Sequence, residues 1–218
     1  MNERERSWSA AGQAAAAQVE DGMRVGLGTG RAAAAGIRAL GARVAAGLRC
    51  RGVPTSRASA ALARELGIRI ERLRHPLDIA FDGADAVDPG GLLVKGGGGA
   101  LVRERLVADA SARFLVLVDP SKLVGSLDAW GVLPLAVVPF GAARAAHELA
   151  DLDPRRRPGR SDDGLAILDL RVPPGSDWRR VAERAGAAPG AVDHGLFEVD
   201  LSRVLVGRPD GTWGPAGA

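Results

Sequence analysis

The sequence lacks tyrosine, has a single cysteine and contains no long apolar run. Aromatic residues make up 4% of its 218 residues, so the core must be built mainly from alanine, valine, leucine and isoleucine, as is common in α/β layers. The lone cysteine, Cys50, excludes an internal disulfide and fits a reducing compartment. No apolar stretch approaches the roughly 20 residues of a membrane span, and the first ten residues lack the apolar core of a signal peptide. We therefore expect a cytoplasmic protein with no membrane partner.

Lysine is also scarce. The chain has 29 lysine and arginine residues together, and only Lys95 and Lys122 are lysines. Because arginine supplies almost every positive charge, the two lysines indicate places that need a compact ammonium with a movable pKa rather than a planar guanidinium.

The net charge of +3 does not indicate a nucleic-acid partner. Basic and acidic residues are interspersed, and only the sequence PRRRPGR (residues 154–160) forms a basic cluster. No aromatic residue accompanies it for base stacking, so we interpret the cluster as a solvated loop. The three histidines, His75, His147 and His194, show no metal-ligand spacing, and we expect no metal site.

Strand and helix patterns alternate through the first 130 residues, which predicts a doubly wound α/β sheet. Thr55-Ser56 is a predicted N-cap and Gly67 a predicted helix stop. We expect a helix over residues 8–20, a strand running into glycines over 23–30 and a helix over 32–48. A strand and a helix follow over 51–70. Further strands are expected within 77–87, 92–110 and 113–124, and the strand within 92–110 is followed by a glycine loop and a helix.

The pattern changes near Trp130. Residues 130–200 form a βαβαβ-like stretch, which we interpret as a small inserted lid, and a strand within 203–211 is expected to return to the main sheet. The expected organisation is a main domain over residues 1–129 and 202–218 with a smaller domain over 130–201.

Four polar or glycine-rich loops follow predicted strands, at residues 28–31, 82–85, 95–99 and 119–122. The carboxyl ends of parallel strands meet at one edge of a sheet, where ligands bind, so we expect these loops to converge. The first loop exposes N–H groups at a helix N-terminus, which favours an anion. A dinucleotide site requires an acidic residue at the end of the next strand, and this strand does not end in one. A small phosphate is therefore the expected ligand, and a turn that merely reverses the chain is the alternative.

Three carboxylates lie in or after these loops. Asp82 and Asp85, three residues apart, could tune each other's pKa and bind several hydroxyls; the alternative is a turn with solvated acids. Glu104 lies in the first turns of the helix after the glycines, where the helix dipole favours its ionised form. That suits a carboxylate base, and a surface ion pair with a neighbouring arginine is the alternative.

The order and spacing of these motifs resemble those of A-type ribose-5-phosphate isomerases. The shared motifs are GLGTG, PTS…LARELGI, FDGADAVD, LLVKGGGGALVRERLVA, FLVLVDPSKLV, LPLAVVP and GLF, which cover about residues 10–211. The resemblance implies a Rossmann-like doubly wound main domain, a smaller α+β domain of ferredoxin-like type, a homodimer or homotetramer, and no cofactor.

The resemblance also implies a function: interconversion of ribose 5-phosphate and ribulose 5-phosphate through an enediolate, in the pentose phosphate pathway. It places the general base on Glu104, the paired aspartates on Asp82 and Asp85, and two site lysines on Lys95 and Lys122. The other expected contacts to the small-molecule sugar phosphate are Thr29, Gly30, Arg31, Ala32, Gly83, Ala84, Gly96, Gly97 and Gly98.

The first loop departs from the family's usual Gly-Thr-Gly-Ser-Thr, because Arg31 and Ala32 replace the last two residues. Either the Arg31 guanidinium binds phosphate bidentately, or it points away and leaves a weaker or altered site. Ala86 and Ala136 stand where the family has glutamates. Two alternatives therefore stay open: an isomerase for a different sugar phosphate, and a non-catalytic sugar-phosphate-binding protein.

Overall fold

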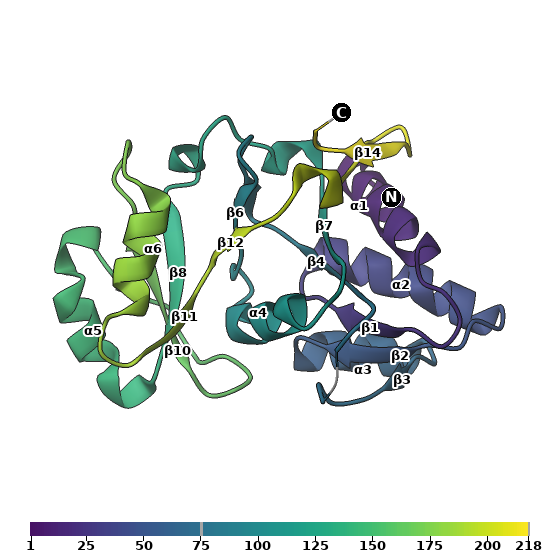
Figure 1. The fold of residues 1–218 in the computed structure, drawn as a ribbon, viewed down its shortest axis with the longest axis horizontal. Helices are drawn as coiled ribbons and strands as arrows, with labels where there is room; N and C mark the ends of the chain where they lie inside the picture. Colours follow the sequence, from purple (N-terminus) through teal and green to yellow (C-terminus); the bar gives the residue numbers. More distant parts are fainter. Residues whose placement is uncertain (75, 218) are drawn as a thin grey trace. The chain divides into compact units, whose positions relative to one another are not determined.

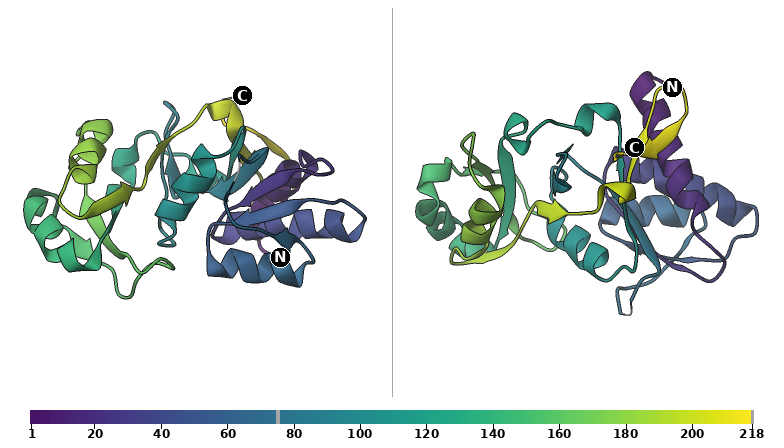
Figure 2. Two further views of the ribbon diagram at one scale, coloured as in Figure 1. Left: turned by 60° about the horizontal axis from the view of Figure 1, so that its bottom comes forward. Right: turned by 45° about the horizontal axis from the view of Figure 1, so that its top comes forward.

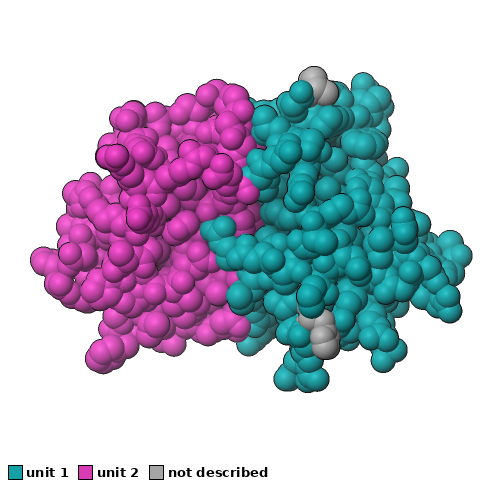
Figure 3. All heavy atoms as spheres, viewed as in Figure 1, with its two compact units in different colours: residues 1–84, 103–123, 199–218 teal, residues 85–102, 124–198 magenta. Residues whose placement is uncertain are grey.

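The structure, a computed structural model, describes residues 1–74 and 76–217 (Figure 1). The chain divides into two compact units (Figure 3). Unit 1 contains Met1–Ala84, Arg103–Leu123 and Val199–Ala218, and unit 2 contains Asp85–Val102 and Val124–Glu198. None of the helices in the described ranges combines the length and the hydropathy of a membrane span.

Unit 1 is built around a seven-stranded sheet in the order β14-β13-β7-β4-β1-β2-β3. All its strand pairs are parallel except β13 with β14 at one edge. The Rossmann-like α/β architecture is thus confirmed, as is the return of the last predicted strand, because β13 pairs with β7. The strands are β1 (Arg24–Leu27), β2 (Arg51–Pro54), β3 (Arg69–Ile70), β4 (Ile79–Gly83), β7 (Phe114–Val118), β13 (Val204–Gly207) and β14 (Trp213–Pro215).

The helices associated with this sheet are α1 (Glu3–Ala17), α2 (Arg31–Ala45), α3 (Arg57–Glu65) and α4 (Leu101–Asp109). The first helix begins earlier than predicted because Asn2 and Glu5 form a capping box. Ser56 caps α3 by accepting a hydrogen bond from the Ser59 N–H, as predicted. Helices α1 and α2 lie side by side (Figure 2), and Gly12 permits their close approach, because a Cβ there would lie 2.6 Å from a backbone nitrogen of α2.

Unit 2 contains a four-stranded antiparallel sheet in the order β11-β8-β10-β9, with α5 and α6 on one side of it (Figures 1 and 2). The chain order β8-α5-β9-β10-α6-β11 is that of a ferredoxin-like fold, so the predicted βαβαβ pattern missed one strand. That strand, β9, has only two residues, both exposed arginines, and shows no apolar alternation. The elements are β8 (Val132–Val137), α5 (Ala142–Glu148), β9 (Arg155–Arg156), β10 (Ala166–Arg171), α6 (Trp178–Gly186) and β11 (Ala191–His194).

A second, three-stranded sheet of unit 2 has the order β12-β6-β5 and is antiparallel. It consists of β5 (Ala86–Val87), β6 (Leu92–Val94) and β12 (Leu196–Glu198). The prediction that the 95–99 loop follows a strand of the parallel sheet is therefore wrong, because β6 pairs with β5 and β12 instead. This pairing also places residues 85–102 in unit 2, whereas the sequence suggested a smaller domain beginning at residue 130.

Short 3-10 helices complete the connections. They are η1 (Pro120–Lys122), η2 (Leu127–Ala129), η3 (Pro139–Gly141), η4 (Ala150–Leu152) and η5 (Leu201–Arg203). Each unit has its own apolar core: Leu27, Ile37 and Phe81 belong to that of unit 1, and Leu133 and Leu168 to that of unit 2.

Candidate active site

Four charged side chains are buried within the described part of the chain. Asp82, Lys95, Glu104 and Asp119 are 2%, 2%, 4% and 3% exposed. Charged residues are almost never fully buried unless they are paired, and departures from the ordinary pattern concentrate at functional sites. All four lie in the loops, or in the helix, that the sequence indicated.

Three of the predicted loops follow adjacent parallel strands. The strands β1, β4 and β7 are neighbours in the sheet, and residues 28–31, Asp82 with Gly83, and residues 119–122 occur at their carboxyl ends. The convergence of these three segments on one edge of unit 1 is confirmed. The fourth loop, 95–99, belongs to unit 2 and follows β6.

Asp82 is bound to the first glycine loop. Its Oδ1 accepts hydrogen bonds from the N–H groups of Thr29 at 2.9 Å and Gly83 at 2.7 Å. A Cβ at Gly28 would overlap the carboxylate, so glycine is needed there for Asp82 to enter the loop. The burial of Asp82 excludes the alternative of a solvated acid at this position. One expectation is corrected: the Thr29 N–H is directed at this carboxylate rather than exposed.

Buried hydroxyl groups support the same loop. The Thr29 Oγ1 lies 2.7 Å from the Thr55 Oγ1, and the Ser59 hydroxyl donates to the Gly28 carbonyl at 2.5 Å. The sequence interpretation missed this role of Thr55 and Ser59. The available signal was their position at and just after the carboxyl end of β2, which pairs with β1 in register.

The orientation of α4 follows from two contacts in its carboxyl-terminal part. The Ala110 carbonyl, just past the helix, accepts a hydrogen bond from the Leu77 N–H at 2.8 Å, near the amino end of β4. One turn earlier, Val107 lies against the face of β1 where a Cβ on Gly26 would overlap it. The carboxyl-terminal end of α4 therefore lies near the amino edge of the sheet, and its amino-terminal end lies toward the carboxyl edge.

Glu104 lies one further turn in that direction. Residues three apart share a helix face, so Glu104 and Val107 both face the sheet, and Glu104 is the nearer to the carboxyl edge. A Cβ on Gly26 would also overlap the Ala80 Cβ, so Ala80 of β4 is on the same face of the sheet as Val107. Asp82 follows Ala80 by two residues, and side chains two apart point to the same face of a strand. Glu104 and Asp82 thus belong to one face and one edge of unit 1. Glu104 is buried, so it is not the solvent-exposed side chain that the alternative interpretation assumed.

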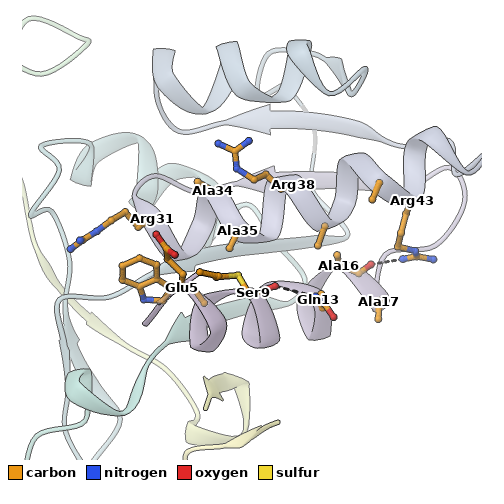
Figure 4. Close-up of a pocket in the computed structure, with 14 residues that line it drawn as sticks. Glu5, Ser9, Gln13, Ala16, Ala17, Arg31, Ala34, Ala35, Arg38 and Arg43 are labelled. Carbon is orange, nitrogen blue, oxygen red and sulfur yellow. Dashed lines mark hydrogen bonds between the residues drawn. The ribbon is translucent and has the colours of Figure 1, made fainter. Parts of the chain in front are cut away.

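Arg31 and the 119–122 turn are joined by Trp8 of α1. The Arg31 guanidinium carbon lies 4.7 Å from the centroid of the Trp8 ring, a cation–π distance. The indole N–H of Trp8 donates to Asp119 Oδ2 at 2.9 Å. Asp119 also caps the turn that contains Lys122, by accepting from the Ser121 N–H. Figure 4 shows Arg31 extending from the start of α2 and Arg38, further along α2, turned away from α1.

Asp119 is ionised at neutral pH. Burial raises the pKa of its carboxyl group, but hydrogen bonds from Ser121 and Trp8 and the nearby Arg4 guanidinium outweigh burial and hold the pKa below its ordinary value. The folded protein therefore gains stability from this carboxylate above the unfolded-state pKa of about 3.9, and that contribution disappears as the pH falls through the lower, folded-state pKa.

We expect Asp119→Asn to lower the free energy of unfolding by about 1–3 kcal/mol at pH 7, because a charge-assisted set of hydrogen bonds is lost. The difference from the wild type should shrink as the pH is lowered from 5 towards 3. Urea denaturation of both proteins across this range measures it, and a difference that does not vary with pH would contradict the assignment of an ionised Asp119.

In unit 2, Lys95 is held by the strand that carries the GLF motif. Its N–H donates to the Gly195 carbonyl at 2.8 Å, and its ammonium lies 5.7 Å from the centroid of the Phe197 ring. A Cβ on Gly195 would overlap the Lys95 carbonyl oxygen, which explains why glycine precedes Leu196. The last strand of the predicted βαβαβ stretch, AVDHGLFEVDL (residues 191–201), is therefore two strands, β11 and β12, which are separated by this glycine.

The glycine loop after Lys95 is bound on two sides. The Gly97 N–H donates to Asp85 Oδ2 at 2.7 Å, and a Cβ on Gly97 would lie 2.6 Å from the Asp85 Oδ1. Arg157 donates from one guanidinium nitrogen to the carbonyls of Gly96 at 2.6 Å and Gly97 at 3.0 Å. The positive φ of 97° at Gly96 requires glycine. Arg157 is the residue that the sequence interpretation missed, since its cluster was assigned to a solvated loop.

No arrangement for a metal ion is found within the described ranges: they contain no suitably placed group of three or more His, Cys, Asp or Glu residues. His147 lies on α5 and His194 on β11. His75 lies outside the described residues.

Known proteins similar to this chain share the predicted family. A sequence model described as ribose 5-phosphate isomerase A (phosphoriboisomerase A) matches residues 51–211. The ribose-5-phosphate isomerase A of Thermomicrobium roseum is 45% identical, with 95% of this chain and 92% of that protein covered. That of Natronomonas pharaonis is 44% identical, with 92% of each covered.

Solved structures agree with the sequence matches. A ribose 5-phosphate isomerase A from Methanocaldococcus jannaschii superposes with a TM-score of 0.87 at 33% identity, covering 95% of this chain and 97% of the other. A D-ribose-5-phosphate isomerase in complex with phospho-erythronic acid gives a TM-score of 0.89 at 32% identity, covering 99% and 100%. The chain therefore belongs to the ribose 5-phosphate isomerase A family.

Proposed function

We propose that this protein is an enzyme that interconverts ribose 5-phosphate and ribulose 5-phosphate. The observation that carries the proposal is the burial of Asp82, Lys95 and Glu104, which are the carboxylates and the ammonium that aldose–ketose isomerisation needs. Membership of the family and the phospho-erythronic acid complex of a similar isomerase support a phosphorylated sugar as the substrate.

The reaction moves the carbonyl group from C1 to C2 of the open-chain sugar. A base must remove the proton on C2, and the same proton equivalent must return to C1, while one hydroxyl proton transfers between the two oxygens. A single carboxylate can carry out both carbon proton transfers. We assign this role to Glu104, a buried carboxyl in the amino-terminal turn of α4.

The enediolate intermediate carries negative charge on the sugar oxygens. Preorganised donors stabilise such charge far better than water does, and we assign Lys95 and the N–H groups of Gly96 and Gly98 to this task. The Gly97 N–H, which was also expected to contribute, donates to Asp85 instead. Asp82 and Asp85 bind sugar hydroxyls and assist ring opening. Gly83 and Ala84, which lie between them in the sequence, also contact the substrate.

These residues come from both units, between which the chain passes four times. The first crossing separates Asp82 from Asp85, and the second lies between Gly98 and Glu104.

The phosphate group binds at the start of α2, whose N-cap Gly30 supplies no side-chain hydrogen bond. The first N–H groups of a helix lack intrahelical partners and favour an anion. Arg31 adds a guanidinium held on Trp8, in place of the two hydroxyls expected of the family, and Thr29, Ala32 and Lys122 complete the contacts.

Arg31→Ala is expected to raise KM for ribose 5-phosphate about 10-fold or more, because a hydrogen bond to a charged group contributes about 1.5–3 kcal/mol. The inhibition constant of inorganic phosphate should rise in parallel, with kcat within a few-fold of the wild type. Arg38→Ala is the matched control, since Arg38 lies on the same helix but is turned away from α1 (Figure 4). Unchanged KM and phosphate inhibition in Arg31→Ala would show that the guanidinium does not contact the phosphate.

A substrate panel tests the proposed activity itself. Purified protein is incubated with ribose 5-phosphate and with other five- and six-carbon aldose phosphates, and the ketose formed is measured. We expect the highest kcat/KM for ribose 5-phosphate. Preference for another sugar phosphate would establish the alternative substrate, and binding without turnover at high protein concentration would establish a non-catalytic sugar-phosphate-binding protein.

We further propose that the protein is a homodimer or homotetramer and acts in the cytoplasm, as the resemblance suggests. Light scattering after gel filtration measures the oligomer.

Cys50 is a free, buried thiol whose pKa is raised by burial. A raised pKa is typical of an inert core cysteine, so we assign Cys50 no part in the reaction.

A further inference from the structure

Arg157 is bound at both ends of its guanidinium. Its Nε and one terminal nitrogen donate to the two carboxylate oxygens of Asp169 at 2.8 Å and 2.6 Å. Its other terminal nitrogen donates to the carbonyls of Gly96 and Gly97. Both members of the ion pair are less than one third exposed. The guanidinium thus connects strand β10, which carries Asp169, to the glycine loop.

These two carbonyl contacts fix the orientation of two successive peptide planes. The peptide group is planar, and in its usual trans form the C=O and the following N–H point in opposite directions. Holding the Gly96 carbonyl on Arg157 therefore directs the Gly97 N–H the other way, where Asp85 accepts it. By the same geometry, holding the Gly97 carbonyl directs the Gly98 N–H away from Arg157.

Such support matters because the loop contains four consecutive glycines, residues 96–99. Glycine has the largest conformational freedom of any residue, so the peptide planes of this loop keep their orientation only through contacts of this kind. Besides those of Arg157, they are the bond from the Gly97 N–H to Asp85 and the bond from the Gly99 N–H to the Gly96 carbonyl at 2.9 Å. Donors stabilise developing charge only when they are already oriented before the reaction. Lysine cannot replace arginine in this contact, because an ammonium lacks the planar fork that binds a carboxylate bidentately while donating elsewhere.

We propose that Arg157 is a positioning residue for the isomerisation: anchored on Asp169, it orients the peptide groups of the glycine loop so that the Gly98 N–H faces the oxyanion of the enediolate. This inference rests on the proposed function. Arg157 acts through the loop and does not itself touch the substrate.

The test compares Arg157→Lys with the wild type in two measurements. We expect kcat for ribose 5-phosphate to fall about 10-fold or more, below the 100- to 1,000-fold loss typical when an oxyanion donor is removed outright, with KM changed less than 3-fold. We also expect faster hydrogen exchange of the Gly97 amide, which donates to Asp85, measured by NMR without substrate. Arg156→Lys, on an exposed position of the neighbouring β9, should change neither.

Asp169→Asn is the second variant and should shift both measurements in the same direction, because it weakens the anchor while leaving the carbonyl contacts in reach. If Arg157→Lys fails to fold, Asp169→Asn by itself tests whether Arg157 positions the loop. Unchanged amide exchange in a folded variant overturns the proposal whether or not the protein turns over ribose 5-phosphate. If amide exchange is faster but kcat stays at the wild-type value, or if only KM changes, the claim that Arg157 positions the loop for catalysis is overturned. A wild type that is inactive on every sugar phosphate refutes the proposed function instead.

Discussion

Glu104→Gln is expected to lower kcat for ribose 5-phosphate isomerisation at least ~100-fold, the lower range for loss of a general base. Glutamine keeps the shape of the side chain but cannot accept a proton from carbon. Substrate binding depends mainly on other groups, so KM should change little. Steady-state isomerisation assays measure both constants.

The control for this variant is Glu148→Gln. Glu148 is an exposed glutamate that forms a surface ion pair with Arg144 on α5, and surface pairs contribute little to stability. It should keep wild-type kinetics. Thermal unfolding of both variants separates loss of the base from loss of the fold, and near-normal turnover by folded Glu104→Gln would refute the assignment.

Lys95→Met is expected to lower kcat about 100- to 1,000-fold, comparable to the removal of one oxyanion-hole donor. The ammonium is buried next to the Phe197 ring, so no water or neighbouring solvated cation can replace it readily. Methionine fills similar space without charge. The measurement is kcat from the same isomerisation assay, with Arg69→Met at an exposed position of β3 as the control.

Lys95→Arg gives a sharper version of this test. If only positive charge is required, arginine should restore most of the activity in a chain that uses arginine almost everywhere else. We expect it to recover less than about a tenth of wild-type kcat, because a planar guanidinium neither fits nor orients as a compact ammonium does. Full activity of Lys95→Arg would show that lysine at this position has no special role.

The sheet could be predicted from the sequence because its signals are local. Short apolar strands that end in glycine or acidic turns, each followed by a helix, specify parallel pairing, and Thr55-Ser56 and Gly67 are the expected helix signals. The positions of Asp82 and Glu104 followed from the same pattern. Their burial did not, since burial depends on which strands become neighbours.

The parts that were not predicted depend on contacts between distant segments. Strand β6 has three residues and no pattern that distinguishes a parallel from an antiparallel partner, so its pairing with β5 and β12 could not be predicted. Arg157 resembles its solvated neighbours in sequence, and only the approach of the glycine loop gives it a distinct role. Likewise the cation–π contact of Arg31 requires α1, whose Trp8 lies more than twenty residues earlier.

The most direct test of the account is NMR of the reaction in D2O with ribose 5-phosphate as the substrate. If the Glu104 carboxylate removes the C2 proton, the resulting carboxylic acid can exchange with D2O before it protonates C1. The wild type should then form ribulose 5-phosphate with solvent deuterium at C1 in the fraction of turnovers in which exchange precedes proton return, and Glu104→Gln should form almost no product, labelled or unlabelled. Equal product formation and labelling by the two proteins would contradict the central role of this carboxylate.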